Sequence, residues 1–144
     1  VEILRLTLHI GLDTFKPLSQ EALDSGKLHG ERVEIPSETA AKLLKARQEN
    51  RRIIAVGTTT VRALESFADG EFETPFSRRT HLFIRPPWEF RLVNGLITNF
   101  HLPRSSLLML VSSLTGRERL LSAYKEAVEQ KYRFFSYGDA MLIL

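Results

Sequence analysis

The sequence predicts an α/β fold in which mainly parallel strands alternate with helices. The short apolar stretch 52–57 ends in a glycine and leads directly into a helical stretch over 58–68. An amphipathic stretch over 117–132 then precedes a final apolar strand. Strands and helices that alternate in this way favour a mainly parallel sheet or a barrel. We expect strands near 2–10, 52–57, 80–84 and 139–144.

The remaining elements follow from local patterns. The first residues alternate between apolar and polar side chains and stop at Gly11, as a strand does. Residues 12–35 are expected to form a loop, because a proline and two glycines interrupt them. A helix then begins with Ser37 as its expected N-cap. The stretch 105–114 has few polar side chains, so we expect a helix that is buried on most sides and ends at Gly116.

Length and composition limit the possible classes of protein. The 144 residues suit one domain, 1–144, and 43% hydrophobic residues are enough for a core. The absence of cysteine excludes disulfides and thiolate metal sites, and it fits a cytoplasmic protein. The longest apolar run, 107–111, is far shorter than the ~20 residues of a membrane span. We therefore expect no membrane association.

The charge pattern suggests a polyanion as partner. The net charge is +3, and fourteen of the 20 basic residues are arginine, whose planar fork suits phosphate and stacks on bases. A solvated surface is the alternative explanation. The candidate phosphate contacts are Arg51, Arg52, Arg78, Arg79, Arg85 and Arg104.

The stretch 55–65, AVGTTTVRALE, is the first candidate site. Gly57 allows the chain to turn tightly after a strand, and Thr58 or Thr59 can cap the helix whose free N–H groups favour an anion. Arg62 and Glu65 stand at i and i+3, so they can pair on one face of the helix. The alternatives are capping alone, or an unrelated α/β enzyme that binds a phosphorylated ligand at Gly57 and Thr58.

The stretch 99–111, NFHLPRSSLLMLV, places polar groups before an apolar helix. Pro103 forces an extended residue before it, and Ser105 or Ser106 then caps the helix. Asn99 and His101 therefore lie on the approach loop, where a neutral histidine can act as general acid or base. The alternative is that both side chains only satisfy backbone groups of the turn.

The stretch 132–141, YRFFSYGDAM, combines aromatic rings with a glycine and an aspartate. Bases or an adenine ring can stack on such rings, and Asp139 can hold ribose hydroxyls or a positive group. The alternative is a core strand with aromatic packing. Ligands of parallel α/β folds collect outside the carboxyl ends of the strands. We therefore expect one concavity lined by His9, Thr14, Gly57, Thr58, Asn99, His101 and Asp139.

Several long stretches together resemble one known family. They are TLHIGLDTF followed by Lys16 and Pro17, LHGE, AVGTTTVRALES, LITNFHLPRSSLLMLVSSLTG and YRFFSYGDAMLI. In these motifs the chain resembles the S-adenosylmethionine:tRNA ribosyltransferase-isomerases of queuosine biosynthesis, the QueA family. The resemblance implies that residues 1–144 are a single C-terminal portion of a mixed α/β barrel-like catalytic domain. The family's N-terminal half and its small inserted β-barrel are absent, and Asp13 and Pro87 stand where the family usually has glycine.

The resemblance also implies a reaction. The ribosyl part of S-adenosylmethionine, the co-substrate, is transferred to the 7-aminomethyl-7-deazaguanine base of tRNA, giving epoxyqueuosine and releasing adenine and methionine. This chemistry needs a base for a proton beside the sulfonium and an acid that helps adenine to leave, but no metal. His29-x-Glu31 is the stretch most similar to the spacing of metal ligands, but two candidate ligands are too few for a metal site. A cytoplasmic enzyme that is monomeric at full length is expected.

The expected catalytic residues are His101, Asp139 and His9. His101 is the first candidate for proton transfer, Asn99 orients it or the substrate, and Asp139 holds the ribose or the incoming amine. The expected substrate-binding residues are Thr14, Phe15, Gly57, Thr58, Thr59, Arg62, Asn99, Phe100, Arg133, Phe135, Tyr137 and Gly138. A non-catalytic RNA-binding module, or an incomplete fragment, is the alternative of a different class.

Overall fold

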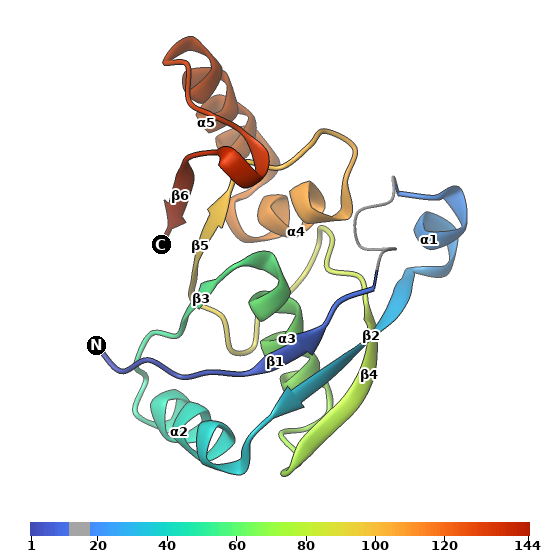
Figure 1. The fold of residues 1–144 in the computed structure, drawn as a ribbon, viewed down its shortest axis with the longest axis vertical. Helices are drawn as coiled ribbons and strands as arrows, with labels where there is room; N and C mark the ends of the chain where they lie inside the picture. The colour runs from blue at the N-terminus through green and yellow to red at the C-terminus, as the bar shows by residue number, and fades with distance from the viewer. Residues whose placement is uncertain (12–17) are drawn as a thin grey trace.

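The chain forms two three-stranded sheets, and one helix contacts strands of both (Figure 1). The computed structural model describes residues 1–11 and 18–144, without the side chain of Tyr137. The strands are β1 (Thr7–His9), β2 (Lys27–Ile35), β3 (Ile54–Val56), β4 (Phe76–Leu82), β5 (Gly95–Asn99) and β6 (Ala140–Ile143). The helices are α1 (Gln20–Ser25), α2 (Ser37–Gln48), α3 (Thr58–Asp69), α4 (Ser106–Thr115) and α5 (Arg117–Glu129), and a short 3-10 turn, η2, spans Phe135–Tyr137.

The sheets are mixed rather than mainly parallel. One sheet has the order β1-β2-β4 and the other the order β3-β5-β6. Among the strands of the described residues, only β3 and β5 pair in parallel. The expectation of mainly parallel strands is therefore wrong, although the mixed α/β class is confirmed.

The error arises at the two central strands. Within the predicted loop, residues 20–25 form α1 and residues 27–35 form β2. A bulge between Lys27 and Glu31 absorbs the irregular, glycine-containing part of this strand. β2 then pairs antiparallel with both of its neighbours. β5, the centre of the other sheet, is a strand that the sequence patterns did not indicate.

The four longer helices lie where the sequence predicts them, but two of the expected caps are wrong. Ser105 caps α4 by accepting a hydrogen bond from the Leu108 N–H, as expected. Ser37 is instead the first residue of α2 and not its cap. At α3 the cap position belongs to Gly57, whose φ of 90° is a conformation that glycine adopts readily, so neither Thr58 nor Thr59 caps the helix.

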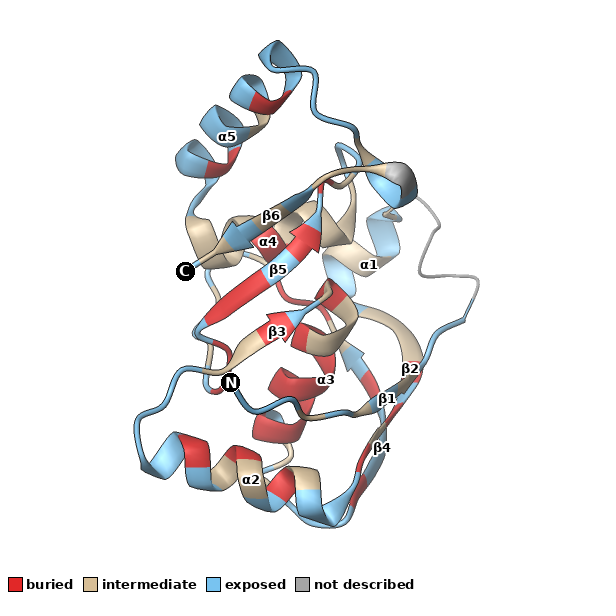
Figure 2. Ribbon diagram, turned by 60° about the vertical axis from the view of Figure 1, so that its left-hand side comes forward, coloured by how far each residue is buried: buried red, intermediate tan, exposed pale blue. Residues whose placement is uncertain are grey.

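Among the described helices, α3 has the most buried residues. Its residues from Val61 to Ala68 are all buried, whereas α5 is largely exposed (Figure 2). Apolar side chains of β2, β4 and β5 pack with it in one cluster. α4, which was expected to be buried on most sides, has only Leu110 and Val111 fully buried. The prediction of burial from its apolar composition was therefore too strong.

A buried carboxylate on α3 holds the segment that leads into β5. Glu65, which is 1% exposed, accepts hydrogen bonds from the backbone N–H groups of Arg91, Leu92 and Val93 at 3.0–3.1 Å. The spacing of Arg62 and Glu65 had suggested an ion pair between them, but Glu65 does not pair with Arg62. A carboxylate that accepts several N–H bonds compensates for the loss of water on burial. Glu65 thus fixes the approach to the second sheet.

Replacing Glu65 by alanine leaves these backbone donors without an acceptor, two of them at buried residues. We expect Glu65→Ala to lower the free energy of unfolding by about 2–4 kcal/mol in urea denaturation. Glu129→Ala is the control, because Glu129 pairs only at the surface with Lys125, and it should change stability by less than about 0.5 kcal/mol. Equal effects of the two variants would contradict this role of Glu65.

Candidate functional site

The carboxyl ends of the parallel strands β3 and β5 bring two of the predicted stretches together. Val56 pairs with Ile97 across the two strands, and the Gly57 N–H donates to the Ile97 carbonyl at 2.8 Å. The start of α3, including Thr58 and Thr59, therefore lies beside the end of β5. Asn99 is the last residue of β5 and not part of the approach loop as expected, and His101 follows two residues later.

His101 is held at two points. Its Nε2 shares a hydrogen bond of 2.8 Å with the hydroxyl of the buried Thr98, and its backbone N–H donates to the Tyr124 hydroxyl at 2.7 Å. Partial burial lowers the pKa of the His101 imidazole below its ordinary value. The ring is therefore neutral near pH 7, which is the form that can accept a proton.

Asp139 and Arg133 close a turn beside this loop. The Asp139 carboxylate accepts hydrogen bonds from the Arg133 backbone N–H at 2.8 Å and from its Nη2 at 3.3 Å. The backbone bond, then the side-chain bond, lowers the pKa of Asp139. A Cβ on Gly138 would come within 2.5 Å of the Arg133 carbonyl, so the turn needs a residue without a side chain. Asn99 Nδ2 donates to the Asp139 carbonyl at 3.3 Å and joins the turn to β5.

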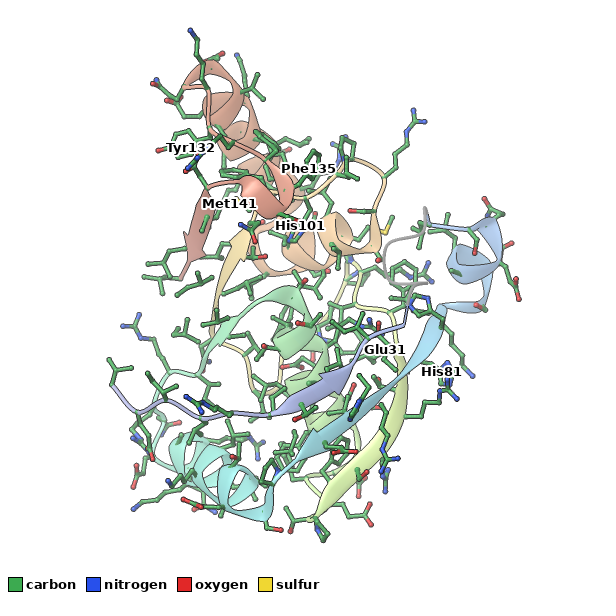
Figure 3. All side chains as sticks on the ribbon, viewed as in Figure 1. Glu31, His81, His101, Tyr132, Phe135 and Met141 are labelled. Carbon is green, nitrogen blue, oxygen red and sulfur yellow. The ribbon has the colours of Figure 1, made fainter. Side chains whose placement is uncertain are left out.

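The aromatic rings divide into packed and accessible ones. Phe100 is 4% exposed, and its ring centroid lies 4.9–5.9 Å from those of Tyr124, Tyr132 and Phe134, so it packs in the interior. Phe135 is 46% exposed and has a φ of 64°, unusual for a residue with a side chain. Its N–H donates to the Phe100 carbonyl at 3.2 Å, which places it beside the His101 loop (Figure 3).

A second group of polar side chains lies between α3 and β2. Arg62 donates through Nη1 to Glu31 Oε2 at 2.5 Å and through Nε to the Leu82 carbonyl at 3.3 Å. Burial lowers the pKa of Arg62, and the charge of Glu31 partly offsets this. Arg62 Nη2 is buried and, within the described part of the chain, has no hydrogen-bond partner. His29 Nε2 lies 3.6 Å from the other oxygen of Glu31.

The sequence patterns had given no functional role to His29 or Glu31. Their spacing had been noted only as too small a set for a metal. The structure adds that Glu31 pairs with the distant Arg62. Across residues 1–11 and 18–144, no three or more His, Asp or Glu side chains are placed to hold a metal ion.

His9 does not join the Asn99–His101 group. It stands in register with Arg32 of β2, which in turn stands opposite Arg79 of β4, so the three lie in one row on the outer face of the first sheet. A groove of about 610 Å³ contains this row. Its lining is His9, Ile10, Gly11, Gly30, Arg32, Ser77, Arg78 and Arg79.

The six predicted arginines do not share one surface. Only Arg78 and Arg79 line the groove, and Arg51 instead pairs with Glu49 and Glu2. Arg85 donates to the Leu23 carbonyl at 2.8 Å. Thr14 and Phe15, the remaining site predictions, lie outside the described residues. None of the helices in the described ranges is long and apolar enough to cross a membrane.

Comparisons with known proteins agree on one family. A family model described as "Queuosine biosynthesis protein" matches residues 1–143. Relatives from Carboxydothermus hydrogenoformans and Thermotoga maritima, both named S-adenosylmethionine:tRNA ribosyltransferase-isomerase, are 55% and 50% identical over 144 residues. Each match covers 100% of this chain and 43% of the relative, so the chain spans less than half of their length.

A solved structure supports the fold. The crystal structure of S-adenosylmethionine tRNA ribosyltransferase from Thermotoga maritima matches with a TM-score of 0.70 at 53% sequence identity. The match covers 79% of this chain and 40% of that one. Because the family model extends over nearly every residue, the chain belongs to the queuosine biosynthesis protein family.

Proposed function

We propose that the chain forms part of the catalytic domain of an S-adenosylmethionine:tRNA ribosyltransferase-isomerase. The observation that carries this proposal is the identity of 50–55% along the whole chain to relatives of that name. In the proposed reaction, S-adenosylmethionine is the co-substrate and the 7-aminomethyl-7-deazaguanine base of tRNA receives the ribosyl group. The two open sheets would then belong to a larger barrel-like domain of a cytoplasmic enzyme that is monomeric at full length.

The proposed active centre lies at the carboxyl ends of β3 and β5. His101 transfers a proton, because its imidazole is neutral near pH 7 and is fixed through Thr98. Phe135 offers an accessible ring on which a base can stack. Asp139 and Gly138 shape the turn that presents this ring, and Asn99 ties the turn to β5.

The proposed activity is tested with the protein at its complete natural length. It is incubated with S-adenosylmethionine and tRNA that carries the 7-aminomethyl-7-deazaguanine base, and adenine release and the modified base are measured. Release of adenine that depends on this tRNA supports the proposal. Binding of tRNA without any turnover would instead favour a non-catalytic RNA-binding module.

Replacing His101 by alanine tests its role in proton transfer. We expect turnover to fall by a factor of ~10² or more, with unchanged binding of S-adenosylmethionine and an unchanged melting temperature. Because the pKa of His101 is lowered, the neutral form persists below pH 6.5, and the acid limb of the wild-type activity should lie below that value. A loss of activity that accompanies unfolding would favour a purely structural role.

The groove on the first sheet is proposed to contact tRNA phosphates. Arg32 and Arg79 stand in one row with His9, and Glu34, which pairs with Arg32, lies outside the groove lining. Phosphate contacts by such side chains make binding depend on salt, since each contact releases counterions.

Arg32→Ala and Arg79→Ala should each weaken tRNA binding about equally for all sequences. Each should also reduce the slope of log K against log salt concentration by about one. Binding is measured by fluorescence anisotropy at several salt concentrations. Arg51→Ala is the control, because Arg51 is not among the residues that line the groove. A slope that Arg32→Ala and Arg79→Ala leave unchanged would remove the groove from tRNA binding.

A further inference from the structure

Three side chains form a line from the interior of the protein toward its surface. Arg62 is 3% exposed at its side chain, Glu31 is 0% exposed and His29 is 29% exposed. Glu31 stands between the other two, with Oε2 on the guanidinium at 2.5 Å and Oε1 at 3.6 Å from the imidazole. Only the last member of the line is partly accessible to a ligand.

The backbone of β2 brings His29 to this place. Alternate residues of a strand point to opposite faces, so Glu31 points toward α3, whereas Arg32 points outward into the groove. The register of β2 against β4 shifts between Lys27 and Glu31, and His29 lies within this irregular part. Bulges of this kind are common beside active sites because they redirect a side chain.

Stability alone does not explain the group. A buried ion pair contributes little net stability compared with apolar side chains of similar volume, since both charges lose their water. Here the cost is larger, because Arg62 Nη2 is buried and has no hydrogen-bond partner among the described residues. The fixed bond from Nε to the Leu82 carbonyl shows that Arg62 is nevertheless held in one position.

We infer that His29 is a second proton-transfer residue of the proposed reaction, with Glu31 as its positioning residue and Arg62 as the anchor of that carboxylate. A carboxylate beside an imidazole orients the ring and stabilises the imidazolium that forms when the ring takes a proton. The inference rests on the proposed function, which needs two proton transfers. It assigns the removal of the proton beside the sulfonium to His29. His101 is left to assist the departure of adenine as a hydrogen-bond donor, through the N–H that its neutral ring keeps.

A sulfonium makes the C–H bonds next to sulfur acidic, since the positive sulfur stabilises the carbanion. The neutral imidazole of His29 takes this proton and becomes imidazolium. The electron pair of the C–H bond stays on the carbon beside sulfur, and no oxidant, reductant or metal takes part. The Glu31 carboxylate, which is paired with Arg62, balances the new positive charge.

The test separates this step from the rest of the reaction. The complete-length protein is incubated in D₂O, and deuterium exchange into S-adenosylmethionine beside the sulfonium is measured together with adenine release and the Kd for S-adenosylmethionine. His29→Asn should reduce exchange and kcat by ~10² or more, and it should leave Kd within a factor of about three. Glu31→Gln should reduce kcat and leave Kd unchanged, because the amide cannot balance the imidazolium.

His81→Asn is the matched control. His81 lies on the neighbouring strand β4, is exposed and shares a hydrogen bond of 2.9 Å through Nδ1 with the Leu28 carbonyl (Figure 3). It should leave exchange and kcat unchanged. Added imidazole should restore part of the exchange in His29→Ala, which a merely structural histidine would not permit.

The outcomes are distinguishable from failure of the proposed function. A wild-type protein that releases no adenine overturns the proposed function itself. An active wild type whose exchange survives His29→Asn overturns the present inference and leaves the function standing. A His29→Asn variant that loses the binding of S-adenosylmethionine or its melting transition, with no rescue by imidazole in His29→Ala, also overturns it. Because the His29 side chain is partly exposed, His29→Asn and His29→Ala should fold even if Glu31→Gln does not. They therefore test the inference by themselves.

Discussion

The buried ion pair between Arg62 and Glu31 is the contact on which the arrangement of α3 and the first sheet depends. Each charge is tolerated in the interior only because the other is there, and removing one partner of such a pair costs about 3–5 kcal/mol. The pair also fixes the register of β2. A shift by one residue would turn Glu31 outward and bring Arg32 inward, against the core.

α3 has a second polar anchor one turn further along. Arg62 holds β2 of the first sheet, whereas Glu65 holds the backbone of 91–93, which leads into β5 of the second. The helix therefore fixes both sheets through charged side chains at positions three residues apart. The turn at Gly57, which begins this helix, is joined to β5 by the bond from the Gly57 N–H to the Ile97 carbonyl. Rigid support of this kind is what a site of fixed geometry requires.

The four longer helices were predictable from the sequence because their signals are local, whereas α1 lies in a stretch expected to be a loop. The periodicity of α2 and α5 and the serine before α4 lie within one or two turns of chain. The strands β2 and β5 were not predictable, since their pairing partners are distant and their glycines resemble those of loops. The predicted pairing of Arg62 with Glu65 was wrong for the same reason, because both side chains have partners that are remote in sequence.

The candidate site was predictable only in part. The Gly57 N–H bonds to Ile97, two residues before Asn99 and four before His101, so these motifs meet at the strand ends as the rule indicates. His9 was misplaced because its strand belongs to the other sheet and its side chain points outward. The row formed with Arg32 and Arg79 arises from the register of three strands, which no single stretch of sequence encodes.

The order of the strands along the chain has a consequence for folding. Pairing of β2 with β4 closes a loop that contains β3 and α3, and pairing of β3 with β5 closes a loop that contains β4. Each sheet therefore encloses a strand of the other, so neither can be completed from a continuous segment. Such non-local pairings slow folding, because loop entropy is lost before the contacts that compensate for it have formed. The two sheets consequently gain their stability together, as one cooperative unit.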